Sequence, residues 1–105
     1  MAPGMDPAGI PALLESIRHM HGCSARHVET AHVRETAPTG ETVWDGDVEV
    51  FELVGHDGAS RAYAWSEAVG SSGRRRFFVV LHVPPVDSPV VAVRVSILAD
   101  AKQAR

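Results

Sequence analysis

The sequence is poor in several residue types, and each scarcity argues against a class of protein. Its one cysteine, Cys23, cannot form an internal disulfide, which favours a reducing, cytoplasmic setting. No apolar run approaches the roughly 20 residues that span a bilayer, and no basic residue precedes Arg18, so neither a membrane span nor a secretory signal is expected. Asparagine is absent and Lys102 is the only lysine, a composition that suggests a GC-rich bacterial source.

The length and apolar content indicate one small globular domain. The chain has 105 residues, of which 45% are hydrophobic, and this is enough to bury a modest core. Residues 1–9 are rich in proline, glycine and alanine, and we expect them to form a flexible N-terminal arm. Residues 10–105 are then expected to form a single α+β domain.

The charge is unevenly distributed along the chain. Residues 1–54 contain nine acidic and three basic side chains, whereas residues 55–105 contain four acidic and seven basic ones. The only basic run, residues 74–76, follows a Gly/Ser turn and is expected to open a strand. Since nucleic-acid binding requires an extended basic surface, we expect no nucleic-acid partner.

Helical patterns lie at the two ends of the domain. Residues 10–21 have Pro11 in the first turn, apolar side chains at helical spacing and Gly22 just beyond the end, which predicts a short helix. Residues 88–103 fit both an alternating strand and a helix. We favour the helix, because Ser88 and Pro89 form a typical helix start.

Four strand patterns separated by three turn signals occupy the middle of the chain. The predicted strands are residues 25–36, 41–54, 61–68 and 75–83. The resulting fold class is α+β with the order α-β-β-β-β-α: a four-stranded antiparallel meander packed by two helices as a two-layer sandwich, with both helices expected on one face.

Period-2 alternation suggests how the strands pair and which faces they share. Centring the first turn between Pro38 and Thr39 places His32 opposite Asp45 on a polar face. Extending the alternation assigns these residues to the core face: Trp44, Val48, Val50, Tyr63, Trp65, Phe77, Val79, Leu81 and Val83.

The opposite face is charged beside the first hairpin and apolar towards the last strands. Its apolar part is expected to be an interface, because a contiguous exposed apolar surface usually binds something. A second helix, a second subunit or a ligand could cover it. The predicted interface residues are Phe51, Leu53, Ala62, Ala64, Phe78 and Val80.

A cluster of histidines around the cysteine raises the possibility of a metal site. It contains His19, His21, Cys23, His27 and His32, all of them residue types that bind transition metals. The spacing matches no established zinc pattern, and the strand alternation sends His27 and His32 to opposite faces. We therefore expect no metal and no cofactor; a site, if formed, would use His19, His21 and Cys23.

Polar residues on the predicted core face form a second candidate site. His27, Glu29 and Tyr63 could transfer protons in a cleft, with Trp44, Trp65 and Glu52 binding a ligand beside them. The alternative is that Glu29 and Glu52 reach the rim and pair with arginines. No nucleophile motif or phosphate-binding loop supports an enzyme.

Three functional hypotheses follow. The first is a non-enzymatic binding or assembly module, expected to form a homodimer through its apolar sheet face and to bind a protein partner or a small apolar ligand. The second is a small enzyme or ligand-binding protein that uses the cleft around His27, Glu29 and Tyr63. The third is a metal-binding protein that uses the histidine and cysteine cluster. Neither nucleic acid nor a membrane is an expected partner.

Overall fold

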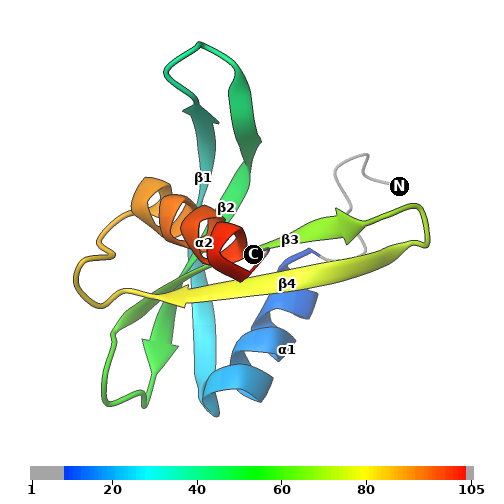
Figure 1. The fold of residues 1–105 in the computed structure, drawn as a ribbon. Helices are drawn as coiled ribbons and strands as arrows, with labels where there is room; N and C mark the ends of the chain where they lie inside the picture. Colours follow the sequence, from blue (N-terminus) through cyan, green and yellow to red (C-terminus); the bar gives the residue numbers. More distant parts are fainter. Residues whose placement is uncertain (1–8, 104–105) are drawn as a thin grey trace.

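The computed structural model describes residues 9–103 as one antiparallel sheet with a helix before it and a helix after it (Figure 1). The sheet order is β1-β2-β3-β4, so each strand pairs with its neighbours in sequence. The α+β class, the α-β-β-β-β-α order and the helical assignment of the C-terminal segment are confirmed. The elements are α1 (Ile10–His21), β1 (Ser24–Thr36), β2 (Thr42–Val54), β3 (Arg61–Val69), β4 (Arg74–Leu81) and α2 (Pro89–Gln103).

Local signals set the ends of both helices as expected. Gly22 ends α1 in the left-handed conformation with φ of 67°, and its N–H donates to the carbonyl of Arg18 at 2.8 Å. Ser88 precedes α2, and its hydroxyl accepts a hydrogen bond from the N–H of Val91 at 3.3 Å. Pro89 occupies the first helical position, where its missing N–H costs nothing.

The two helices lie on opposite faces of the sheet, contrary to the expectation that they share one. Along β2, Phe51 contacts α1 residues while the adjacent Val50 belongs to the cluster beneath α2. Side chains of successive strand residues point to opposite faces, so α1 and α2 are on different sides (Figure 1). Each helix therefore makes its own two-layer packing with the sheet.

The α1 side and the α2 side have separate cores. Leu13 and Ile17 anchor α1 and are 2% and 0% exposed, which stabilises the fold by roughly 1.5–3 kcal/mol for each side chain. Met20, near the end of α1, is 49% exposed. On the other side, α2 covers Tyr63, Trp65 and their neighbours in β2 and β4.

The faces predicted for β4 are reversed. Trp65 pairs with Phe78 and Tyr63 pairs with Val80, so Phe78 and Val80 lie on the α2 side, and Phe77 and Val79 lie on the α1 side. The reason is that residues 77–81 are apolar without interruption. Alternation therefore contains no information about which of the two faces each side chain takes.

The first hairpin pairs two residues out of the predicted register, and β1 contains a bulge. His32 pairs with Asp47 rather than Asp45, an even shift that keeps the side chains of residues 29–35 on their predicted faces. The pairing skips between His27 and Glu29, which leaves Val28 as an extra residue in β1. From there to the start of β1 the faces are exchanged.

Two features complete the description of the fold. Neither helix within residues 9–103 has the length and apolar content to span a bilayer. The predicted N-terminal arm lies outside the described residues except for Gly9, which precedes α1 and accepts hydrogen bonds from Ala12 and Leu13. Its proposed flexibility stays a prediction.

Candidate functional site

The bulge in β1 separates the two residues at the centre of the predicted catalytic group. His27 pairs with Phe51 on the α1 side, with a ring separation of 5.4 Å, whereas Glu29 pairs with Val50 on the α2 side. Tyr63 also lies on the α2 side. The prediction that His27, Glu29 and Tyr63 share one face is therefore wrong. It assumed that side chains alternate regularly along β1, whereas Val28 is an extra residue without a partner in β2.

His27 takes part in a polar network on the α1 side of the first hairpin. Its Nε2 lies 2.8 Å from Oε1 of Glu49, and the same oxygen accepts a hydrogen bond from the Thr30 hydroxyl. Farther along, His32 bridges Asp45 at 2.9 Å and Asp47 at 3.0 Å. The side chain of His32 thus contacts Asp45 although its backbone partner is Asp47, and the hydrogen bond to Asp47 is the main cause that raises the pKa of His32.

Tyr63 has a partner that the sequence did not indicate. Its hydroxyl shares a hydrogen bond of 2.6 Å with Nδ1 of His82, just after β4. Burial is the main cause that raises the pKa of Tyr63, and the nearby carboxylates of Asp87 and Glu29 add to it while Arg61 opposes it. Tyr63 is 2% exposed, so this pair fastens the end of β4 to the core.

The candidate ligand-binding residues are occupied by contacts within the chain. Trp65 is 2% exposed and stacks on Phe78 at 5.2 Å, and Trp44 meets it edge-on at 5.8 Å. Both indole N–H groups donate to Oε2 of Glu67, at 2.8 and 3.2 Å. Glu52 pairs with Arg26, which is the rim pairing considered as the alternative.

The three candidate metal ligands lie in different environments. His19 is exposed on α1, and Cys23 is a free thiol that is 8% exposed in the core beneath α1. His21 lies against His56 with ring centroids 6.0 Å apart, and burial is the main cause that lowers its pKa. Within residues 9–103, no three side chains of histidine, cysteine, aspartate or glutamate are grouped to hold a metal ion.

The predicted interface residues are divided between the two covered faces. Phe51, Ala62 and Ala64 are each 0% exposed on the α1 side, where Leu53 packs with them. Phe78 and Val80 pack against the cluster beneath α2. The cover that the sequence left open is therefore supplied within the chain, by α1 on one side and α2 on the other.

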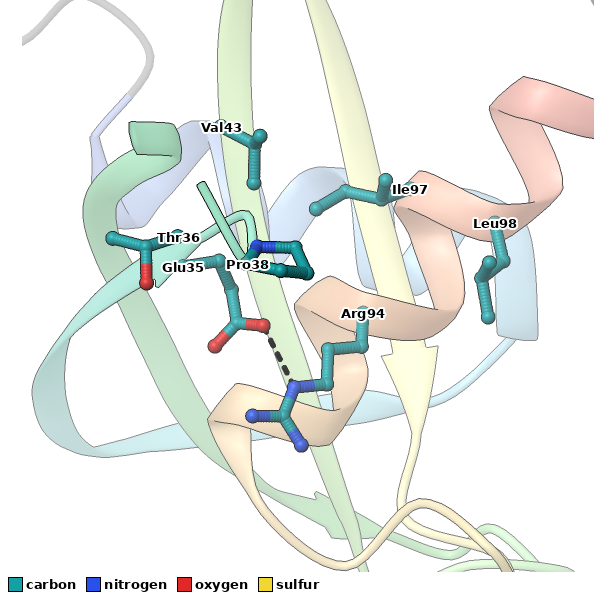
Figure 2. A pocket seen from close by; sticks show the side chains of 7 residues that line it. All are labelled: Glu35, Thr36, Pro38, Val43, Arg94, Ile97 and Leu98. Atoms are coloured by element: carbon teal, nitrogen blue, oxygen red, sulfur yellow. Dashed lines mark hydrogen bonds and ion pairs between the residues drawn. The ribbon is translucent and has the colours of Figure 1, made fainter. Parts of the chain in front are cut away.

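An apolar groove lies elsewhere, between the tip of the first hairpin and α2 (Figure 2). We call it the hairpin groove. It has a volume of about 440 Å³ and is largely open to solvent. Its lining residues are Glu35 and Thr36 at the end of β1, Pro38 in the turn that follows, Val43 at the start of β2, and Arg94, Ile97 and Leu98 on one side of α2.

The two charges in the hairpin groove neutralise each other. Nε of Arg94 donates to Oε1 of Glu35 at 2.7 Å across the groove, a contact that raises the pKa of Arg94 (Figure 2). The rest of the groove surface is mainly apolar, because Leu98 is 63% exposed and Val43 is 52% exposed. The groove can therefore receive an uncharged, apolar group.

Sequence reasoning missed the hairpin groove, although a signal for it existed. The stripe of Val90, Val93 and Ile97 accounts for the buried side of α2, but Val95 and Leu98 leave its other sides apolar as well. A helix that is apolar nearly all round needs cover on more than one side. Comparison with protein-family models, with curated proteins and with solved structures finds no match to this chain.

Proposed function

We propose that the chain is a non-enzymatic binding module that works as a homodimer and holds an apolar segment of a partner protein in the hairpin groove. The observation that carries the binding role is the groove itself, with Leu98 63% and Val43 52% exposed beside a neutralised Glu35–Arg94 pair. Exposed apolar surface of this kind is typical of protein contact sites.

The shape of the groove favours a protein segment over a small ligand. Sites for small molecules usually enclose most of the ligand surface, whereas the hairpin groove is largely open to solvent. A charged segment would have to compete with the 2.7 Å contact between Glu35 and Arg94 to gain a partner, while an apolar segment leaves that contact intact. The preferred partner is therefore an uncharged, apolar stretch of chain.

The cellular setting is part of the same proposal. A cytoplasmic location is supported by the single thiol, Cys23, which is buried and free. A bacterial source is supported by composition alone.

The groove can be tested with the neutral dye Nile red, whose fluorescence rises in apolar surroundings. Leu98→Glu and Val43→Glu are expected to weaken dye binding at least about fivefold, since a buried unpaired carboxylate is unfavourable. Val54→Glu is the matched control, because Val54 is 59% exposed at the far end of β2. Equal dye binding by all three variants would rule out the groove as the apolar binding site.

Amide chemical shifts supply a second readout of the same experiment. Titration with Nile red is expected to move the resonances of Val43, Ile97 and Leu98 first. Shifts centred on any other surface would contradict the proposal even if the dye binds.

A further inference from the structure

The two outer edges of the sheet differ in how well they are protected against pairing with another strand. The β1 edge contains the Val28 bulge and alternating charged side chains, both of which hinder edge-to-edge association. The β4 edge has neither over Phe77–Leu81, where five apolar residues follow one another without bulge or proline. Within residues 9–103, β3 is the only strand that pairs with β4.

The backbone groups that β4 directs outward can be identified from one hydrogen bond. The N–H of His82 donates to the carbonyl of Arg61 at 2.8 Å, so it points towards β3. In an antiparallel ladder the backbone N–H and C=O groups of successive residues point alternately to the two sides of the strand. Those of Phe78 and Val80 therefore also point towards β3, and those of Phe77 and Val79 point to the open edge. The edge therefore presents main-chain donors and acceptors at Phe77 and Val79, whereas the outward carbonyl of Leu81 already accepts a hydrogen bond from the N–H of Val83 at 2.9 Å.

We propose that β4 pairs antiparallel with β4 of a second copy of this chain, about a two-fold axis at Phe78. In this register Phe77 of one copy bonds with Val79 of the other, and Arg75 lies opposite Leu81. Two four-stranded sheets then become one continuous sheet. The contact uses the same strand on both sides, so it closes as a dimer and does not propagate.

Charge along β4 favours a second copy in this antiparallel arrangement. Arginines occupy positions 74–76 at the start of β4, and although Arg76 pairs with Asp100 at 2.8 Å, this end keeps a net positive charge. The other end of β4 is marked by Tyr63, whose hydroxyl bonds to His82. Two carboxylates, Asp87 and Glu29, and one arginine, Arg61, lie close enough to this hydroxyl to affect its pKa. Antiparallel pairing brings the arginine end of one copy beside the net acidic end of the other, whereas parallel pairing would align arginine with arginine.

Val79→Pro tests the inference directly, with Val79→Ala as its matched control. Both variants lose the valine packing on the α1 side, but only proline removes an outward N–H and obstructs the edge. Light scattering after size-exclusion chromatography is expected to give twice the chain mass of 11.3 kDa for the wild type and Val79→Ala, and 11.3 kDa for Val79→Pro. Circular dichroism checks that each variant is folded.

If Val79→Pro does not fold, the distance between two spin labels tests the pairing of β4 with β4 instead. A nitroxide at Arg74→Cys, in a Cys23→Ala background, reports on the exposed start of β4. Pairing about Phe78 separates the two Cα atoms of position 74 by about 27 Å, from the rise along a strand. A distance outside the range this geometry and the label linkers allow would overturn the inference.

The inference rests on the proposed homodimer but not on the hairpin groove, and the outcomes separate them. A wild type that is monomeric at its highest soluble concentration would overturn both the homodimer and the β4 pairing. A dimer that persists in folded Val79→Pro would overturn only the β4 pairing. Nile red binding in Val79→Pro reports on the groove independently of both.

Discussion

The two hairpins of this sheet have the same topology but differ in the polarity of their surfaces and in how those surfaces are covered. The β1–β2 hairpin has a charged, uncovered surface near its tip, held by contacts such as His32 with Asp45 and Asp47. Away from its tip, the β3–β4 hairpin is apolar on both faces and is covered by α1 on one side and α2 on the other. The outer edge of the first hairpin, β1, is therefore protected against pairing with another strand, whereas the outer edge of the second, β4, is not.

Replacing Trp65 by alanine is expected to have the largest effect on stability. Trp65 is 2% exposed and stacked on Phe78, so its loss should reduce the free energy of unfolding by about 3–5 kcal/mol. Thr30→Ala in the first hairpin, which removes one exposed hydrogen bond, is expected to cost less than about 1 kcal/mol. Urea denaturation measures both, and similar losses would contradict the division between the hairpins.

Gly46→Val is expected to have the next largest effect, because Trp44 folds over Gly46. A Cβ atom at position 46 would lie 3.1 Å from Cη2 of Trp44, and the larger valine would displace the indole from Trp65. Overpacking of this kind costs about 1–3 kcal/mol. Thermal denaturation and the near-ultraviolet circular dichroism of the tryptophans check this, and an unchanged tryptophan signal would argue against the contact.

Tyr63→Phe is expected to reduce the free energy of unfolding by about 1 kcal/mol, because it removes the hydrogen bond to His82. The same variant should increase amide exchange at the end of β4, since the pair fastens that end to the core. Urea denaturation and hydrogen exchange measure the two effects. A loss of stability without faster exchange at Leu81 and His82 would contradict the fastening role.

The smallest expected effects are the pH dependences of two histidines, which run in opposite directions. The raised pKa of His32 means that its contribution to stability is full below pH 6.5 and is lost as pH rises through the folded-state pKa. The lowered pKa of His21 means that folding loses stability as pH falls below 6.5.

Proton NMR titration should find the two pKa values on opposite sides of 6.5. In the His32→Gln variant, the part of the change in free energy of unfolding between mildly acidic and mildly alkaline pH that His32 causes is expected to disappear. The titration of His21 is expected to stay the same. A His32 pKa at or below that of His21 would contradict the bridge to Asp45 and Asp47.

The contrast between the hairpins also explains what could be predicted from the sequence. Glycines, prolines and apolar spacing define both helices and all four strands to within two residues. In the first hairpin, polar and apolar residues alternate, so the face of His32 was predicted correctly. In β4 both Phe77 and Phe78 are apolar, and the faces were reversed because nothing in the pattern distinguishes them.

The candidate site was less predictable, for two physical reasons. The Val28 bulge is a local departure from regular pairing, and it alone moves His27 away from Glu29 and Tyr63. The hairpin groove joins Val43 to Leu98, and only the docking of α2 against the hairpin brings these distant segments together. Neither feature follows from spacing along the chain.

Amide hydrogen exchange, followed residue by residue at several protein concentrations, tests the central difference between the two edges most directly. The outward amides of Phe77 and Val79 are predicted to be protected at high concentration and to exchange rapidly on dilution, while those of Phe78 and Val80, which face β3, stay protected throughout. Rapid exchange of Phe77 and Val79 at every concentration would contradict the pairing of β4 with a second copy.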